Sequence, residues 1–221
     1  MRIVIAGAHG QIARRLGRLL SARGDTVIGV VRNPDHRSDV RTDGMDPVVL
    51  DLESASVDDV VAAVRDADAV VFAAGAGPGS GAARKDTVDR GAAVLLADAA
   101  ESAGVQRYLL VSSVGVESVA DGARPEGMDD VFLAYLRAKL AAEQEVLART
   151  GLRTTVLRPG SLTDDPGTGR VTLRPSVDRG SVPRDDVAAV LVALLDADLD
   201  GAVLELVGGP TPVAEAVASV G

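Results

Sequence analysis

The sequence predicts an α/β fold in which helices cover a doubly wound parallel sheet and a small C-terminal lobe follows. Strand-like and helix-like segments alternate almost throughout the 221 residues, which is typical of parallel strands joined by crossover helices. Hydrophobic residues make up 47% of the chain and aromatic residues only 2%. The core must therefore consist of Val, Leu, Ile and Ala, as in most buried parallel sheets.

The first half of the chain predicts five strands and three helices. The strands are expected at 1–6, 26–31, 47–50, 69–72 and 107–111, and the helices at 14–23, 57–64 and 87–102. A loop rich in Asp, Arg and Pro follows the second strand, and a glycine-rich loop over 75–81 follows the fourth.

The second half predicts a long amphipathic helix at 131–150 that ends at Gly151, a usual C-terminal cap. Further elements are expected as strands at 152–157, 171–173 and 203–207, a helix at 184–195 and a last helix after Thr211-Pro212. We expect a single domain over 1–221, in which 159–182 and the C-terminal segment form a small lobe on the substrate side.

Composition excludes several classes of function. The net charge of −9 argues against binding to nucleic acids and to anionic membranes. There is no cysteine, which excludes disulfides, thiolate nucleophiles and zinc–thiolate sites. The two histidines are too few for a multi-histidine metal site, so no metal is expected.

The chain carries no obvious targeting segment. The first apolar run is short and ends in Gly-Ala-His-Gly, which leaves no room for a signal peptide, and no apolar stretch approaches membrane-spanning length. The expectation is a cytoplasmic protein. The oligomeric state is not predicted.

A strand, a glycine turn and a helix follow one another at the N-terminus. Residues 7–13 read G-A-H-G-Q-I-A, and the N–H groups of a helix that begins at a strand end favour an anion such as a pyrophosphate. The G-x-x-G-x-x-A spacing matches the dinucleotide fingerprint G-x-G-x-x-G only in part, so a tight turn that binds nothing is the alternative. The candidate cofactor contacts here are Gly7, His9, Gly10, Gln11 and Ile12, although a spacer residue is the safer interpretation of His9.

Arg32 directly follows the second expected strand. Proteins that bind a ribose with a free 2′-hydroxyl usually place Asp or Glu there, whereas an arginine suits a 2′-phosphate through charge-assisted hydrogen bonds. Arg37, a few residues on, can join it. The sequence thus favours NADP(H) over NAD(H), and the alternative is that Arg32 is a solvated loop arginine.

The next two strands end in residues that suit the rest of a dinucleotide. Asp51 can accept a hydrogen bond from an adenine amino group while Leu52 covers the ring, although an aspartate of a turn is an equal alternative. The small residues Ala73, Ala74 and Gly75 leave space for a ribose or nicotinamide, but such residues are also common in loops.

Ser112 and Ser113 follow the fifth strand, and Tyr135 and Lys139 lie four residues apart in the long helix. This spacing places the phenol and the ammonium on one face of the helix, where the positive charge favours the phenolate. Tyr135 is therefore a candidate general acid or base. The alternative is a solvent-exposed pair on the helix surface.

These segments resemble the short-chain dehydrogenase/reductase superfamily, and more narrowly its atypical, compact NAD(P)H-binding branch of epimerase/dehydratase-like and flavin-reductase-like proteins. The resemblance covers nearly the whole chain. It is carried by I-V-I-A-G-A-H-G-Q-I-A, V-V-R-N-P-D, D-L-E, V-F-A-A-G-A-G, L-V-S-S-V-G, Y-L-R-A-K, L-R-P-G-S-L and P-R-D-D-V-A.

The resemblance implies a Rossmann-type domain that binds NADP(H) and a catalytic set of Ser113, Tyr135 and Lys139. Tyr135 would donate a proton to a carbonyl oxygen held by Ser113, and Lys139 would tune Tyr135 and bind the nicotinamide ribose. Pro159 and Gly160 would line the nicotinamide end. The asparagine that many superfamily members carry on the helix after the fourth strand is absent, and Asp89 and Arg90 stand near its place.

Two functions follow as hypotheses. The first is an NADP(H)-dependent oxidoreductase or epimerase-like enzyme that acts on a carbonyl or hydroxyl of a small molecule. The second is a regulatory protein that senses NAD(P)H and acts through a partner without turnover. The retained Tyr135 and Lys139 favour the enzyme.

Overall fold

The computed structural model describes residues 1–77 and 79–221. Within them, a central sheet of nine strands runs in the order β11-β8-β10-β6-β5-β4-β1-β2-β3. The strands are β1 (Arg2–Ala6), β2 (Thr26–Val31), β3 (Asp46–Val49), β4 (Ala69–Phe72), β5 (Arg107–Val111), β6 (Arg153–Pro159), β8 (Arg170–Arg174), β10 (Ala202–Gly208) and β11 (Thr211–Pro212). All of the neighbouring pairs from β3 to β10 are parallel, and β8 runs antiparallel to β10 and β11. The predicted α/β fold with a doubly wound parallel sheet is confirmed.

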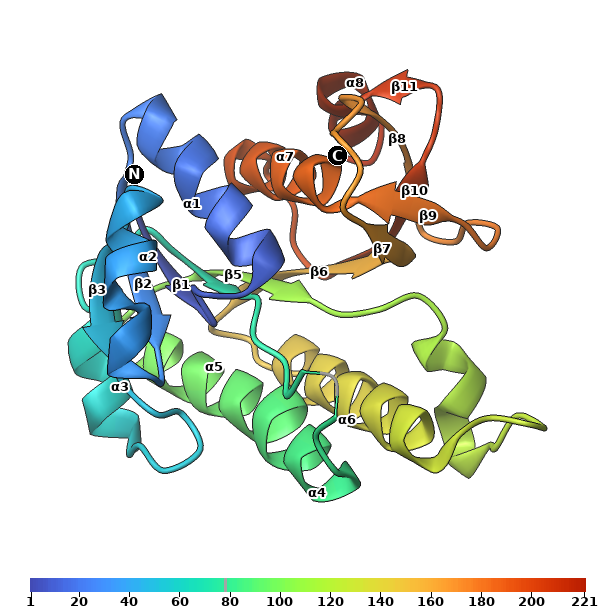
Figure 1. Cartoon of the computed structure of the whole chain (residues 1–221), viewed down its shortest axis with the longest axis horizontal. Coiled ribbons are helices and arrows are strands. Elements are labelled where there is room, and N and C mark those ends of the chain that lie inside the picture. The colour runs from blue at the N-terminus through green and yellow to red at the C-terminus, as the bar shows by residue number, and fades with distance from the viewer. Residues whose placement is uncertain (78) are drawn as a thin grey trace.

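Helices cover both faces of the sheet (Figure 1). They are α1 (Gln11–Arg23), α2 (Arg37–Thr42), α3 (Val57–Val64), α4 (Ala82–Arg84), α5 (Ala92–Ser102), α6 (Asp130–Leu147), α7 (Arg184–Asp196) and α8 (Val213–Ala218), with the short helical segments η1 (Pro34–His36), η2 (Lys85–Gly91) and η3 (Val116–Gly122). On one face, α1, α7 and α8 bury residues such as Leu16 and Leu191. On the other, α3, α5 and α6 bury residues such as Leu96 and Val146.

The segment after β6 forms a second, two-stranded sheet from β7 (Ser161–Thr163) and β9 (Ser181–Pro183). Between these strands the chain contributes β8 to the main sheet, where it lies between β10 and the edge strand β11. The lobe expected over 159–182 thus supplies strands to both sheets, and its place beside a substrate stays a prediction.

Several short elements differ from the sequence prediction. The expected loop after β2 contains η1 and α2, because Val40 of α2 is buried against Met45 in the core. The helix expected from residue 87 begins earlier, with α4 and then the π-helical segment η2. A π-helical turn is rare and frequently marks a functional site, and here it places Lys85 and Asp89 on the buried side. In the described residues, no helix has the length and apolar character needed to cross a bilayer.

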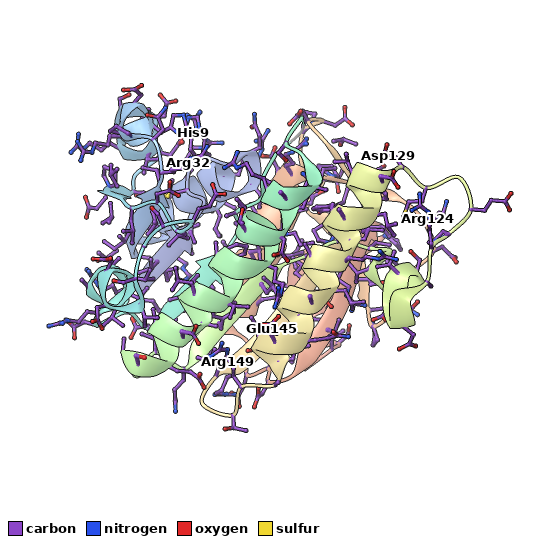
Figure 2. The ribbon with its side chains drawn as sticks, turned by 90° about the horizontal axis from the view of Figure 1, so that it is seen from below. His9, Arg32, Arg124, Asp129, Glu145 and Arg149 are labelled. Carbon is purple, nitrogen blue, oxygen red and sulfur yellow. The ribbon has the colours of Figure 1, made fainter. Side chains whose placement is uncertain are left out.

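The order of the strands fixes where a ligand can bind. From β1 the chain builds outward through β2 and β3 and then returns to β4 on the other side of β1. Such a switch point opens a crevice beyond the carboxyl ends of the strands. In the view of Figure 2, His9 and Arg32 lie at the same end of the molecule as Asp129 at the start of α6, whereas Glu145 and Arg149 lie at the opposite end.

Candidate functional site

The turn after β1 presents the first turn of α1 to this crevice. Gly7 has a positive φ of 80°, and a Cβ on it would lie 2.6 Å from the Cα of Ala74 after β4. Gly10 precedes α1 without a side-chain cap, and the first turn of the helix carries no acidic residue. Within the part of the chain that the structure describes, no side chain caps the first N–H groups of α1, and the positive end of the helix dipole favours an anion there.

A first cavity of about 350 Å³ lies beside this turn, at the ends of β1, β2, β3 and β4. It brings together many of the predicted cofactor contacts, namely Gly7, His9, Gly10, Arg32, Asp51, Leu52, Ala73, Ala74 and Gly75. Arg37 is exposed at the start of α2 and does not line the cavity, because the turn of η1 separates it from Arg32. Its contact with a cofactor stays a prediction.

Glu53 links three other residues at the rim of the first cavity by hydrogen bonds. Its Oε2 accepts hydrogen bonds from Arg32 Nη1 at 2.9 Å and Arg84 Nη2 at 2.6 Å, and its Oε1 accepts one from Thr87 Oγ1 at 2.8 Å. These bonds, that of Arg84 above all, lower the pKa of Glu53 to about 2. The carboxylate therefore neutralises part of the charge that Arg32 would offer to a phosphate.

Glu53 and Arg84 are not among the contacts predicted from the sequence, because only the fold brings the two residues together. Asp51 lines the cavity and its Oδ1 accepts a hydrogen bond from the Glu53 N–H at 3.1 Å. Asp51 thus stabilises a turn and also lines the cavity. The two interpretations from the sequence, an aspartate of a turn and a contact to the adenine amino group, are therefore compatible.

The two histidines stack on each other beside the glycine turn. The ring centroids of His9 and His36 are 3.5 Å apart at an interplanar angle of 10°, and both residues line the first cavity. His9 Nε2 lies 2.9 Å from Asp39 Oδ2, and this hydrogen bond lowers the pKa of Asp39. The imidazole of His9 is thus held by α2 at the wall of the cavity.

A second cavity of about 570 Å³ adjoins the first, and Ala73, Ala74 and Gly75 line both. Apart from Arg37, the second cavity contains the remaining predicted residues, which are Gln11, Ile12, Ser112, Ser113, Tyr135, Lys139, Pro159 and Gly160. The catalytic set predicted from the sequence therefore converges on one space, next to the turn that could hold a pyrophosphate.

Lys139 connects three elements at the floor of the second cavity. Its Nζ donates a hydrogen bond to the Val111 carbonyl at 3.0 Å and lies 3.4 Å from the Ala74 carbonyl. The same atom lies 6.0 Å from the ring centroid of Tyr135. Ser113 Oγ donates to the Val114 carbonyl at 3.1 Å, so its proton must turn to reach a substrate.

Asp89 reaches the same floor from η2. It is fully buried, its Oδ2 accepts a hydrogen bond from the Ala76 N–H at 3.2 Å, and its Oδ1 lies 3.4 Å from Lys139 Nζ. Arg90 points elsewhere and pairs with Glu145 and Asp86. Of the two residues near the place of the family's asparagine, only Asp89 contacts the candidate catalytic lysine.

An unsatisfied polar atom supports the fit of a nucleotide cofactor. Within the described residues, the buried Ser112 Oγ has no hydrogen-bond partner although it lines the second cavity. A buried hydroxyl without a partner is costly, and a ligand that spans both cavities could satisfy it. The uncapped start of α1 likewise offers backbone N–H groups to an anionic group of such a ligand.

Comparisons with known proteins agree with this geometry. A family model described as NAD(P)H-binding matches residues 7–198. An uncharacterized sugar epimerase of Bacillus subtilis, YhfK, is 32% identical over 219 residues, which cover 98% of this chain and 99% of that protein.

Two solved structures extend the comparison to the fold. A Bacillus halodurans protein provisionally assigned as an NAD-dependent epimerase/dehydratase is 35% identical, with a TM-score of 0.88 and coverage of 99% of both chains. The anaerobilin reductase ChuY of Escherichia coli O157:H7 is 26% identical, with a TM-score of 0.79 and coverage of 96% of this chain and 100% of that one. The chain therefore belongs to the NAD(P)H-binding family, a Rossmann-fold family of oxidoreductase-like and epimerase-like proteins.

Proposed function

We propose that the protein is an NADP(H)-dependent oxidoreductase, or an epimerase-like enzyme, that acts on a carbonyl or hydroxyl group of a small molecule. The observation that carries this proposal is the convergence of Ser113, Tyr135 and Lys139 on the second cavity, next to the glycine turn. The names of the two bacterial relatives, an epimerase and an epimerase/dehydratase, and of the reductase ChuY support a reaction of this class.

The cofactor would lie across the two cavities. The first turn of α1 would hold its pyrophosphate, the residues of the first cavity its adenosine, and Pro159 and Gly160 its nicotinamide end. When bound, the reduced cofactor supplies the hydride for the substrate carbon.

The side chains of the second cavity supply the proton and the positioning. Tyr135 donates its phenolic proton to the oxygen of the substrate carbonyl, and in the reverse direction it accepts that proton. Ser113 turns its hydroxyl from the Val114 carbonyl to hydrogen-bond the same oxygen. Lys139, fixed by the carbonyls of Val111 and Ala74, holds a positive charge beside the phenol, which favours the phenolate left after the transfer.

The preference for NADP(H) rests on the two arginines of the first cavity. Arg32 and Arg84 converge on one oxygen of Glu53, so a doubly charged 2′-phosphate could replace that carboxylate between them. NAD(H) offers only a ribose hydroxyl to these arginines. Arg32→Ala should therefore weaken NADPH binding much more than NADH binding, and equal weakening would contradict the role of Arg32.

The reaction is tested by removing one hydroxyl group. Tyr135→Phe should lower kcat for NADPH-dependent reduction of a panel of aldehydes, ketones and quinones by about 10²–10⁴-fold, the usual contribution of a general acid. The matched control is Tyr108→Phe, because Tyr108 is fully buried, its hydroxyl donates to the Ala93 carbonyl, and neither residue lines either cavity.

Unchanged turnover in Tyr135→Phe would reject the acid role. If the wild-type protein binds NADPH tightly yet oxidises it with no carbonyl or quinone of the panel, the sensor hypothesis replaces the enzyme. In that case the protein would act through a protein partner and not on a small-molecule substrate.

A further inference from the structure

Lys85 is, with Lys139, one of the two lysines of the chain, and it also lies beside Tyr135. It stands at the start of η2 and lines the second cavity. Its Nζ lies 5.4 Å from the ring centroid of Tyr135 and donates a hydrogen bond to the Gly77 carbonyl at 2.8 Å. The proposed reaction uses only Lys139, so the position of Lys85 needs a separate explanation.

The charge of Lys85 is buried without a counter-ion. The residue is only 8% exposed, and across 1–77 and 79–221 no carboxylate lies within ion-pair distance of its ammonium group. The Gly77 carbonyl and the face of the Tyr135 ring compensate this desolvated ammonium only in part, since burial of a charge is costly unless an opposite charge accompanies it.

The acidic residues of the second cavity are already engaged. Asp89 faces Lys139 and accepts the Ala76 N–H. Asp129 caps α6 by accepting the N–H groups of Val131 and Phe132. The remaining cation of the cavity, Arg184, pairs with Asp164 at 3.0 Å. Among the residues that the structure describes, Lys85 is thus the cation of this cavity that is free to receive an anion from a ligand.

The rim of the second cavity is apolar. Val131, Phe132 and Leu162 are large hydrophobic side chains that remain exposed, and all three line this cavity. Phe132 stacks on Tyr135 with ring centroids 5.8 Å apart. Exposed apolar groups around a cleft with a few convergent polar groups are typical of a binding site for a partly apolar small molecule.

We infer that Lys85 binds a carboxylate of the substrate, and that the substrate is an apolar carbonyl compound in which this carboxylate lies only a few bonds from the reacting carbonyl. The inference rests on the proposed carbonyl function for the position of the reacting group. The short distance from Lys85 Nζ to the Tyr135 ring sets the separation of the two groups. The carboxylate replaces the missing counter-ion and orients the carbonyl towards Tyr135.

Binding without turnover tests the inference most cleanly. The protein is saturated with NADP⁺, which cannot reduce a ketone, and titrated by calorimetry with phenylglyoxylate and with its methyl ester. The acid should bind about tenfold or more tightly than the ester, as expected for one charge-assisted contact. Equal affinities, or no binding of either probe, would overturn the inference without the need for any variant.

Variants then locate the contact. Lys85→Gln should abolish the preference for the acid and leave the affinity for the ester unchanged, while Lys85→Arg should keep part of the preference because it keeps the charge. Arg137→Gln is the matched control, since it removes one positive charge from the exposed side of α6 and should keep the full preference. If Lys85→Gln still prefers the acid over the ester, a residue other than Lys85 binds the carboxylate.

Turnover separates the two proposals. Reduction of the ester with no preference for the acid would reject the role of Lys85 and keep the carbonyl function. Lys85-dependent binding of the acid, without reduction of any carbonyl by NADPH, would reject the function and keep the anion subsite.

Discussion

At the scale of single residues, Glu53 decides how much positive charge the first cavity offers. It accepts hydrogen bonds from Arg32, Arg84 and Thr87, and its low pKa of about 2 keeps it ionised near neutral pH. The same contacts that order the rim of the cavity therefore oppose the binding of a phosphate at that place.

Glu53→Gln should tighten NADPH binding and leave NADH binding nearly unchanged. The amide removes the negative charge that competes with a 2′-phosphate for Arg32 and Arg84, and a gain of several-fold is expected from one charge-assisted contact. Fluorescence titration with both cofactors measures the effect. Glu126→Gln, at an exposed loop position, controls for the change in net charge, and an equal gain there would reject the competition.

The ion pairs of Glu53 also predict a pH dependence of stability. The folded-state pKa is depressed from 4.5 to about 2, so the stabilisation is fully present above the unfolded value and is lost as the pH falls towards 2. The difference in free energy of unfolding between wild type and Glu53→Gln should therefore narrow between pH 6 and pH 3.5. Urea unfolding at the two pH values measures it, and a constant difference would mean that Glu53 stabilises the fold without its charge.

At the scale of elements, the junction of β1 and α1 depends on close packing. Gly7 combines a positive φ with a Cβ position 2.6 Å from the Ala74 backbone. Gly24, which caps the other end of α1, has a similar φ of 92° but nothing within 4 Å of its Cβ position. A side chain at Gly24 would therefore add backbone strain alone, whereas a side chain at Gly7 would add both backbone strain and a clash between the turn after β1 and Ala74 after β4.

Gly7→Ala should lower the melting temperature more than Gly24→Ala and should abolish cofactor binding. Both substitutions impose left-handed strain of about 1–2 kcal/mol, but only the first also pushes the turn away from Ala74. Thermal melts and NADPH titration of the two variants provide the comparison. Normal affinity in Gly7→Ala would show that the glycine turn does not hold the cofactor.

A buried arginine links β6 to α6 and η3 on the same side of the sheet. Arg158 bonds to both carboxylate oxygens of the buried Glu143 and to Glu117 at 2.7 Å. It directly precedes Pro159 and Gly160, which line the second cavity. The charge cluster thus fixes the strand end from which these two residues reach the cavity.

Arg158→Met should destabilise the protein by about 3–5 kcal/mol, because it leaves Glu143 buried without a counter-ion. The double variant Arg158→Met/Glu143→Leu should recover part of this loss, since it removes both charges. Urea unfolding of the two variants distinguishes the outcomes. A double variant less stable than the single one would mean that the arginine stabilises the fold through packing.

At the scale of the whole molecule, the sequence predicts the long helices and the strands of the central sheet better than it predicts the short helices. The strand that ends at Ala6, the helix that carries Tyr135 and Lys139, and the strand after Gly151 appear close to their expected bounds. Hydrophobic periodicity and glycine punctuation suffice for such elements, because each is long or strongly patterned. The α2 helix was missed because its six residues depend on the burial of Val40.

The residues of the candidate site were likewise predictable only in part from the sequence. Residues just after strands were predictable, because a parallel sheet gathers the carboxyl ends of its strands at one edge. Contacts between loops were not predictable from the sequence. The pairing of Arg32 with Glu53 and Arg84, and the approach of Lys85 and Asp89 to the predicted pair Tyr135 and Lys139, depend on how η2 packs. No local pattern encodes that packing.

A dinucleotide that lies across both cavities, with its pyrophosphate on the turn at residues 7–13, must bind to the purified protein in solution. Calorimetric titration with NADPH and with NADH measures this binding. We expect one binding site per chain and tighter binding of NADPH than of NADH. Heat of binding for neither dinucleotide, with protein shown to be folded, would contradict this expectation.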